Sequence, residues 1–291
     1  MSVLIEADLI LNNDESVYHI CMRPENLADV VIIVGDPKHL DDITKHFTNI
    51  DHSASNREFI SITGYNKGRR ITALSTGIGT SNVDIIMHEL DALANFNLEN
   101  REQLPVLKPL KIIRLGTTST IQRDIPINSF ILSTHAVGLD NLMYFYRDAD
   151  KIIDQNLTQN FAMHSQWPES LSLPYFINGS DRLIKRFSQF AIQGITATSP
   201  GFFGPQARYL KLDPADPEML SKLQSFQFGK YRIVNFDMET SALYGLGGLM
   251  GHEMITIYAV IANRVTSEYN SNYQTVFEKL VDLALEEIIT D

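Results

Sequence analysis

The chain has 291 residues, which is long enough to bury one large hydrophobic core, because α/β domains of roughly 200–250 residues are common. Its formal net charge of -11 at pH 7 excludes a general electrostatic attraction to nucleic acid or to an anionic membrane, so any phosphate site must be local. The single cysteine, Cys21, excludes an intrachain disulfide framework. We therefore expect a single domain over residues 1–291.

Short apolar and β-branched runs alternate along the chain with segments of helical periodicity, which is typical of an α/β domain. The runs predict strands over residues 30–34, 71–74, 112–115, 130–134, 195–198 and 255–262. The periodic segments predict helices over residues 83–96, 181–192 and 240–250. A C-terminal helix is expected to bury a face made of Val276, Phe277, Leu280, Val281, Ala284 and Ile288. Ser81 and Asn82 are candidate caps for the first helix.

Two polar, uneven tracts interrupt this pattern, at residues 97–109 and 211–229. The first predicts a surface loop. The second contains Pro214 and Pro217 and lies between two strands.

The N-terminus does not have the features of a targeting segment. Residues 1–8 lack a basic region and a long apolar core of the kind that signal peptides carry. No stretch approaches the roughly 20 apolar residues that span a bilayer. These features predict a cytoplasmic protein without a membrane partner.

The run from Thr198 to Tyr209 is the most informative stretch, because it places Gln206 and Arg208 two positions apart behind Phe202 and Phe203. In an extended segment, residues spaced by two point to the same side, so an amide and a guanidinium can converge on one flat ligand edge. A neighbouring phenylalanine could stack on the face of that ligand. Uracil would satisfy this donor and acceptor set, although a Gly/Pro-rich surface turn is the alternative interpretation.

Arg114 is a second unusual feature, because it interrupts the apolar strand at Ile112-Ile113-Arg114-Leu115. An unpaired charge there would be costly, so a bound anion would account for it. Glycine-rich turns follow other predicted strands, at Gly35-Asp36-Pro37 and at Ser75-Thr76-Gly77-Ile78-Gly79. Backbone N–H groups in such turns suit phosphate.

These segments occur in one chain order, together with Asp237-Met238-Glu239 before an apolar helix and the pair Asn263-Arg264. In this order they resemble the uridine phosphorylase branch of the nucleoside phosphorylase family, from about Val17 to Arg264. The resemblance implies a central mixed β-sheet flanked by helices, and homodimers with shared active sites that assemble into a homohexamer. It also implies that residues 97–109 are an insertion and that part of residues 211–229 covers the pocket.

The resemblance implies a pentosyltransferase that converts uridine, or deoxyuridine or thymidine, and inorganic phosphate to the free base and a (deoxy)ribose 1-phosphate, with no organic cofactor and no metal. The implied phosphate ligands are Gly35, Arg57 from a neighbouring subunit, Arg114, Thr117 and His39, which stands where the family has arginine. The implied ribose ligands are His19 from the partner subunit, Asp237 in place of the usual Glu, Met238 and Glu239. The implied base ligands are Phe202, Gln206, Arg208, Ile261 and Arg264.

Among these residues, Arg114, Gln206, Arg208 and Glu239 are the expected catalytic set. Asn263 stands where the purine enzymes of the superfamily place a catalytic Asp, which favours pyrimidine substrates. Two alternatives stay open: a hydrolytic nucleosidase of the same fold, and a catalytically weakened nucleoside-binding protein. His88-Glu89 and His252-Glu253 each lack a second histidine four residues after the first, so no zinc-protease helix is predicted.

Overall fold

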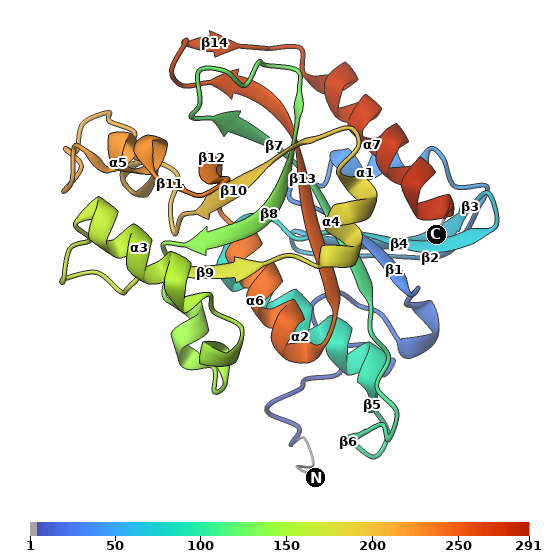
Figure 1. The fold of residues 1–291 in the computed structure, drawn as a ribbon. Coiled ribbons are helices and arrows are strands. Elements are labelled where there is room, and N and C mark those ends of the chain that lie inside the picture. The colour runs from blue at the N-terminus through green and yellow to red at the C-terminus, as the bar shows by residue number, and fades with distance from the viewer. Residues whose placement is uncertain (1–4, 291) are drawn as a thin grey trace.

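The computed structural model describes residues 5–290. Residues 1–4, part of the segment considered above for a signal peptide, lie outside the described residues. Twelve strands form one mixed sheet with the order β11-β12-β10-β8-β13-β7-β1-β4-β3-β2, in which β14 pairs with β13 and β9 pairs with β8 (Figure 1). The remaining strands, β5 and β6, form a separate hairpin.

The first strands of the sheet are β1 (Val30–Val34), β2 (Asn49–Asn56), β3 (Phe59–Asn66), β4 (Arg69–Ser75) and β7 (Lys111–Thr120). The others are β8 (Phe130–Gly138), β9 (Tyr175–Asn178), β10 (Ile192–Thr198), β11 (Gln227–Phe228), β12 (Tyr231–Asp237), β13 (Glu253–Asn263) and β14 (Glu268–Tyr269). The hairpin consists of β5 (Phe96–Asn97) and β6 (Glu102–Gln103). The helices are α1 (His39–Thr44), α2 (Thr80–Asn95), α3 (Gln155–Ser165), α4 (Asp181–Phe187), α5 (Met219–Ser225), α6 (Thr240–Met250) and α7 (Gln274–Ile289).

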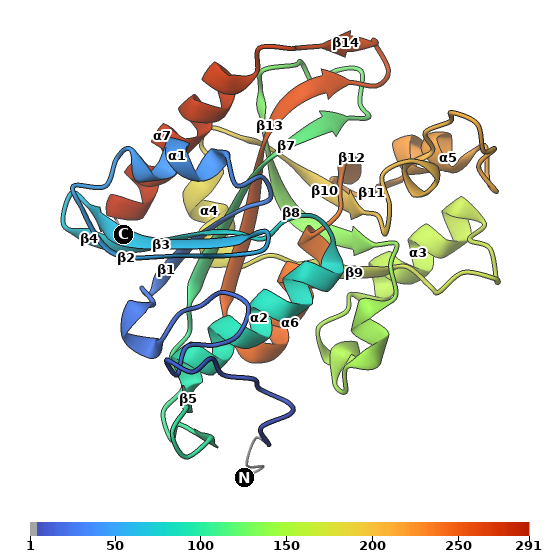
Figure 2. The same cartoon turned by 180° about the vertical axis from the view of Figure 1, so that it is seen from behind.

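Helices cover both faces of the central strands, with α2 and α6 on one face and α1, α4 and α7 on the other (Figures 1 and 2). Strand β1 is parallel to β4 and β7 and is buried along its whole length. Its side chains alternate between the faces, so Val31 and Ile33 join the core under α2 and α6 while Val30, Ile32 and Val34 pack toward α1 and α7. Burial on both faces explains why this strand is a continuous apolar run.

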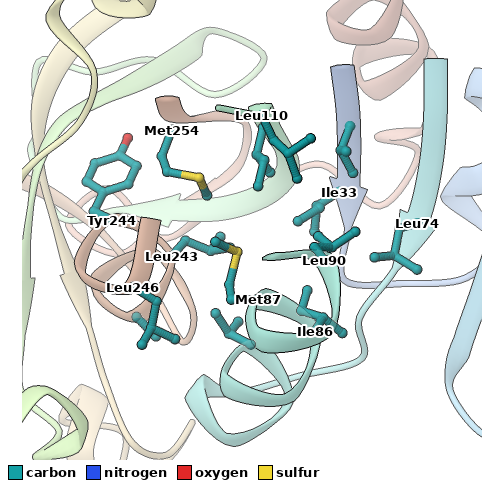
Figure 3. Close-up of a cluster of buried hydrophobic side chains, with 14 of the residues drawn as sticks. Ile33, Leu74, Ile86, Met87, Leu90, Leu110, Leu243, Tyr244, Leu246 and Met254 are labelled. Atoms are coloured by element: carbon teal, nitrogen blue, oxygen red, sulfur yellow. The ribbon is translucent and has the colours of Figure 1, made fainter. Parts of the chain in front are cut away.

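The core on the first face lies between the sheet and the two helices α2 and α6. Figure 3 shows Met87 and Leu90 of α2 and Leu243 and Leu246 of α6 within this cluster. The packing brings the start of α6 beside the start of α2, and the predicted active-site turns lie at both points.

Part of the sheet closes on itself. Strand β12 is parallel to β10, and it also pairs with β7 at Asn235 and Thr120. Strands β7, β13, β8, β10 and β12 therefore form a ring. Residues that are more than 100 positions apart, such as Thr118 and Phe236, are joined by a hydrogen bond across this closure.

The predicted fold class, a mixed sheet flanked by helices, is confirmed, and every predicted strand is present. The predicted helix over residues 181–192 is too long, because α4 ends at Phe187 and Ile192 already begins β10. The proposed caps Ser81 and Asn82 are also wrong. The N-cap of α2 is Gly79, whose φ of 101° favours glycine, and Ser81 and Asn82 lie in the first helical turn.

Strands β2, β3, β9 and β12 and helices α1, α3 and α5 were not predicted. Strand β2 is polar and has no apolar alternation, because it is the exposed edge of the sheet and is held by backbone pairing to β3. The tract 97–109 forms the mostly exposed β5–β6 hairpin and the loop after it, whereas the tract 211–229 contains α5 and β11. Within residues 5–290, no helix combines the length and apolar character needed to cross a bilayer.

Candidate active site

Several of the predicted site residues lie where parallel strands end. Gly35 follows β1, the turn Thr76–Gly79 follows β4, and Thr117 lies in the second half of β7. Because the carboxyl ends of neighbouring parallel strands meet at one edge of a sheet, these three positions are brought together. Asp237 ends β12, and Glu239 is the N-cap residue of α6.

Arg114 is the centre of this group and is only 5% exposed. Its Nη2 donates to Glu239 Oε2 at 2.5 Å, while its Nη1 is 3.9 Å from Asp237 Oδ2, too far for a hydrogen bond. Among the described residues, Nε and Nη1 of Arg114 are buried without any hydrogen-bond partner. We call Arg114, Asp237 and Glu239 the Arg114 cluster.

Small residues leave space around this guanidinium. A Cβ added to Gly116 would come within 2.8 Å of Arg114 Nη1, so a larger residue would displace the side chain. A Cβ on Gly35 would lie 3.5 Å from Gly77 O and 3.9 Å from Arg114 Nη2. The glycine turn after β1 therefore lies beside Nη2, the nitrogen that donates to Glu239, whereas Gly116 borders the unpartnered Nη1.

The charges of the cluster reinforce one another. Burial by itself would lower the pKa of Arg114, but the carboxylates of Glu239 and Asp237 outweigh it and raise that pKa above its ordinary value. Burial raises the pKa of Glu239, while Arg114 opposes the rise. Arg114 is thus a permanent cation in a site that water scarcely reaches.

Glu239 connects the glycine turn, β7 and α6. Its Oε1 accepts a hydrogen bond from Gly79 N at 2.8 Å, and its Oε2 accepts from Arg114. The half-buried Met238 precedes it, and Met238 N lies 3.3 Å from Glu239 Oε2. Thr117 is half-buried on β7 opposite Ala259 of β13.

Asp237 has partners that the sequence did not predict. Its Oδ2 accepts from the hydroxyls of Tyr258 at 2.7 Å and Thr240 at 2.6 Å, and from Thr240 N at 2.8 Å. Its Oδ1 accepts from Thr198 Oγ1 at 2.6 Å. These contacts do not support the expected ribose contact, because they use most of the carboxylate's acceptor capacity for joining β10, α6 and β13. Asp237 therefore places its negative charge near Arg114, while its hydrogen bonds hold the surrounding elements together.

His39 also differs from its expected role as a phosphate ligand. Its ring stacks on Phe277 of α7, with centroids 3.7 Å apart, and its Nδ1 is 3.2 Å from Asp42 Oδ2. The imidazole therefore lies in the interface between α1 and α7. An arginine side chain is longer than histidine and does not pack in this way. The match of position 39 to the family pattern therefore did not predict the contact with Phe277.

Gln206 and Arg208 do come together, but not through an extended segment. Gln206 ends the 3-10 turn Gly204–Gln206, and Ala207 has a φ of 52°, so the chain reverses between the two side chains. Arg208 Nη1 donates to Gln206 Oε1 and, at 3.0 Å, to Phe202 O. The Phe202 ring covers the guanidinium at 3.9 Å. We call residues 202–208 the Gln206 loop.

Arg264 fixes this loop to the end of β13. Its Nη1 donates to Gln206 O at 2.6 Å and its Nη2 to Ala207 O at 3.1 Å. Burial, together with the nearby charge of Arg264, lowers the pKa of Arg208 to about 10. Both arginines therefore remain charged at neutral pH and face the same loop.

The end of β13 is shaped by two further residues. The register with β7 shifts between Val260 and Ala262, so Ile261 lies in a β-bulge that can redirect its half-buried side chain. Asn263 Nδ2 donates to Gln122 O and Ile125 O, both at 3.0 Å, while its Oδ1 accepts from Val265 N and Thr266 N. Its amide is therefore fully used in holding the chain before and after Arg264.

His19 and Arg57 form a separate group. Asn56 Nδ2 donates to the carbonyl oxygens of Tyr18 and His19, and the Arg57 guanidinium is 5.9 Å from the Tyr18 ring centre. Arg57 is exposed at the tip of the β2–β3 hairpin. Within residues 5–290, no hydrogen bond or ion pair connects either residue to the Arg114 cluster or the Gln206 loop.

A cavity of about 970 Å³ opens beside the Gln206 loop. Its lining includes Phe203 and Arg208 of the Gln206 loop, Trp167 and Leu171, and residues 210–216. The lining is mainly apolar, and it includes the beginning of the tract 211–229. No group of three or more His, Cys, Asp or Glu residues suited to a metal ion occurs in the described part of the chain.

Sequence reasoning missed Tyr258, Thr198, Gly79 and Gly116, which support or border the Arg114 cluster. A tyrosine and a threonine within apolar strands were weak signals of a buried polar network. Gly79 was visible as part of the second glycine turn, but its contact with Glu239 joins residues 160 positions apart.

Comparisons with known proteins show the family and agree with the fold. The sequence model of the family described as Phosphorylase superfamily matches residues 29–289. A protein named uridine phosphorylase from Thermococcus kodakarensis is 29% identical over 87% of this chain and 79% of its own length. A purine nucleoside phosphorylase of the DeoD type from Shewanella oneidensis is 27% identical over 92% of this chain and 97% of its own.

Among solved structures, a Trypanosoma brucei nucleoside phosphorylase, described as showing uridine phosphorylase activity, superposes with a TM-score of 0.89. It is 25% identical, and the match covers 98% of this chain and 100% of that one. A uridine phosphorylase from Phytophthora capsici, at 18% identity and a TM-score of 0.70 over 100% of this chain and 99% of its own, shows the same fold.

Proposed function

We propose that the chain, which belongs to the phosphorylase superfamily, cleaves uridine with inorganic phosphate. Deoxyuridine and thymidine are included in the proposed substrate class. The observation that carries the proposal is the buried Arg114 guanidinium, whose Nε and Nη1 have no partner among the described residues. Two buried guanidinium nitrogens without a partner, on an arginine bordered by Gly35 and Gly116, suit a bound oxyanion.

In the proposed phosphate site, Arg114, Gly35 and Thr117 come from one subunit and Arg57 from a neighbour. The exposed position of Arg57, without a hydrogen bond or ion pair to the Arg114 cluster of its own chain within residues 5–290, fits such a contribution. The proposed assembly is a homodimer with shared active sites, repeated in a homohexamer. His39 is left out of the phosphate set because it packs against Phe277.

The proposed reaction needs no organic cofactor and no metal. The bond between C1′ and N1 of uridine breaks while a phosphate oxygen bonds to C1′ from the opposite face, giving uracil and ribose 1-phosphate. The electron pair of the broken bond passes to uracil, and Gln206 and Arg208 stabilise that developing anion. The proton that hydrogen phosphate loses on becoming the ester completes neutral uracil. Glu239 and Met238 hold the ribose, with His19 of the partner subunit at the 5′-hydroxyl.

The side chains of the Gln206 loop favour a pyrimidine over a purine as the base of the proposed substrate. An amide beside a guanidinium can pair with a carbonyl oxygen and a ring N–H of uracil, with Phe202 and Ile261 beside the base. Arg264 acts through the backbone of the loop. Both the nitrogen and the oxygen of the Asn263 amide are hydrogen-bonded to backbone groups, so this side chain has no group free to protonate a purine.

The deciding experiment is to measure uracil release from uridine with and without phosphate. We expect release only with phosphate, together with an equal amount of ribose 1-phosphate. Release without phosphate would instead support a hydrolytic nucleosidase. No release from any pyrimidine nucleoside would support a nucleoside-binding protein, and faster cleavage of inosine than of uridine would support a purine enzyme.

A further inference from the structure

Glu89, on the buried face of α2, has no role in the reaction as described so far, yet its side chain is only 7% exposed and both of its oxygens bond to one segment. Its Oε1 accepts from His19 Nδ1 at 2.7 Å and from His19 N at 3.0 Å. Its Oε2 accepts from Ile20 N at 2.9 Å and lies 3.1 Å from His19 N. Figure 2 shows the N-terminal segment running beside α2.

This contact decides which ring nitrogen of His19 carries the proton. A carboxylate can only accept hydrogen bonds, so the nitrogen that faces it, Nδ1, must be the donor. In the neutral imidazole the other nitrogen, Nε2, then has a free lone pair and acts as an acceptor.

The direction of the ring is fixed as well. Tyr18 and Phe59 meet the imidazole edge-on, with ring centres 4.9 Å and 5.9 Å away. Asn56 Nδ2 holds the carbonyl oxygens on both sides of the residue. The side chain of His19 nevertheless stays 23% exposed, so an orientated acceptor is available at the surface.

We infer that Glu89 is a positioning residue that makes His19 Nε2 an acceptor for the 5′-hydroxyl of a nucleoside held by the neighbouring subunit. The enzyme then selects nucleosides with a free 5′-hydroxyl over 5′-deoxynucleosides and nucleoside 5′-phosphates. This inference rests on the proposed function, in which His19 is shared between subunits. Glu89 acts only through His19 and does not touch substrate.

The selectivity follows from what each substrate offers at its 5′ position. A hydroxyl donates to the lone pair of Nε2, whereas a 5′-deoxy carbon has nothing to donate. A phosphate monoester at neutral pH offers acceptor oxygens and negative charge to an acceptor that has the Glu89 carboxylate behind it. A single neutral hydrogen bond contributes about 0.5–1.5 kcal/mol, so the expected preference for uridine over 5′-deoxyuridine in kcat/KM is about threefold to tenfold.

The kinetic test compares kcat/KM for uridine and 5′-deoxyuridine in the wild type, Glu89→Gln, His19→Ala and the double variant. We expect the ratio to fall toward one in each single variant, and the double variant to match His19→Ala, because Glu89 acts through the ring. Glu99→Gln, on the exposed β5–β6 hairpin, is the matched control and should keep the wild-type ratio. A wild-type ratio retained in Glu89→Gln would overturn the inference, as would a double variant below His19→Ala.

A second readout does not need turnover. The ¹⁵N chemical shifts of His19 in the whole protein should show a protonated Nδ1 in the wild type and a mixture of tautomers in Glu89→Gln. A protonated Nε2 in the neutral wild-type ring would overturn the inference even if uridine is cleaved. If the wild type cleaves neither nucleoside, the proposed function fails, and the tautomer measurement still decides whether Glu89 orients His19.

Discussion

The Arg114 cluster and the Gln206 loop each place an arginine beside oxygen acceptors, but they differ in how many of that arginine's neighbours are already satisfied. The cluster is embedded in strands and helix starts, and two nitrogens of Arg114 have no partner within the described residues. In the loop, Arg208 donates to Gln206 Oε1 and Phe202 O, and Arg264 donates to the carbonyl oxygens of Gln206 and Ala207.

The difference indicates how each region would meet its ligand. If the cluster binds the proposed phosphate, its donor groups are already held in place by strands and helix starts. The loop must first exchange the contact between Gln206 and Arg208 for contacts with a base, and the half-exposed ring of Phe202 moves with it. Phosphate binding should therefore depend on a rigid framework, and base recognition on a segment that adapts.

Removing the cation from the cluster should have the largest effect. Arg114→Ala should lower kcat/KM for phosphorolysis by about a thousandfold, because it removes two anion donors and leaves the buried carboxylates of Asp237 and Glu239 without a neighbouring cation, a loss of about 4 kcal/mol. Steady-state kinetics with phosphate varied would measure this. Arg232→Ala is the control, since that arginine pairs with Asp124 at the surface at 2.8 Å and should change kcat/KM less than twofold.

Because Arg114→Ala also weakens the fold, its phosphate site needs a measurement independent of turnover. Millimolar phosphate should raise the melting temperature of the wild type and should not raise that of Arg114→Lys, which keeps the charge but loses the planar fork. An equal phosphate-induced rise in both proteins would show that Arg114 is not the anion ligand.

The matching test of the loop is Gln206→Leu, for which we expect a smaller loss. Uridine kcat/KM should fall about a hundredfold, because a buried polar edge of the base loses its partner, while the KM for phosphate stays within about twofold. Gln159→Leu, at an exposed position of α3, is the control. A large rise in phosphate KM would contradict the separation of the two regions, and comparable wild-type turnover of inosine and uridine would contradict the assignment of the pair.

Tyr258→Phe tests whether the cluster depends on its rigid support. Burial, with the charge of Asp237, raises the pKa of Tyr258 well above its ordinary value, so the hydroxyl keeps the proton that it donates to Asp237. Removing it should destabilise the fold by about 1–2 kcal/mol. The melting temperature should therefore fall by about 2–6 °C, with only a few-fold loss in kcat. The control is Tyr209→Phe, at a residue that is 63% exposed, which should leave the melting temperature unchanged. An unchanged melting temperature for Tyr258→Phe would show that Tyr258 does not support the cluster.

The smallest effect should come from His39, which lies outside both regions. His39→Gln should change the KM for phosphate by less than about threefold, because the ring packs on Phe277 and bonds to Asp42 rather than to the space beside Arg114. Phosphate titration of initial rates would show this. A tenfold rise in the KM for phosphate would show that His39 contributes to the phosphate site.

Much of the architecture was visible in the sequence. Strands buried on both faces, such as β1, are continuous apolar runs, and α6 begins and ends where its apolar pattern does. The edge strand β2 and the short helix α1 had no comparable signal, because backbone pairing and a few tertiary contacts stabilise them.

The candidate site divides in the same way. A charged residue inside an apolar strand, glycines after strands, and a Gln and Arg two positions apart are local patterns, so Arg114, Gly35, Gln206 and Arg208 could be selected from the residues alone. The contacts that surround these residues could not be predicted from the sequence. Three features depend on residues that meet only in the folded chain. They are the reversal of the Gln206 loop, the packing of His39 on Phe277, and the hydrogen bonds of His19 to Glu89, 70 positions away. Local chemistry is encoded residue by residue, whereas orientation, tautomer and hydrogen-bond partner depend on which elements pack together.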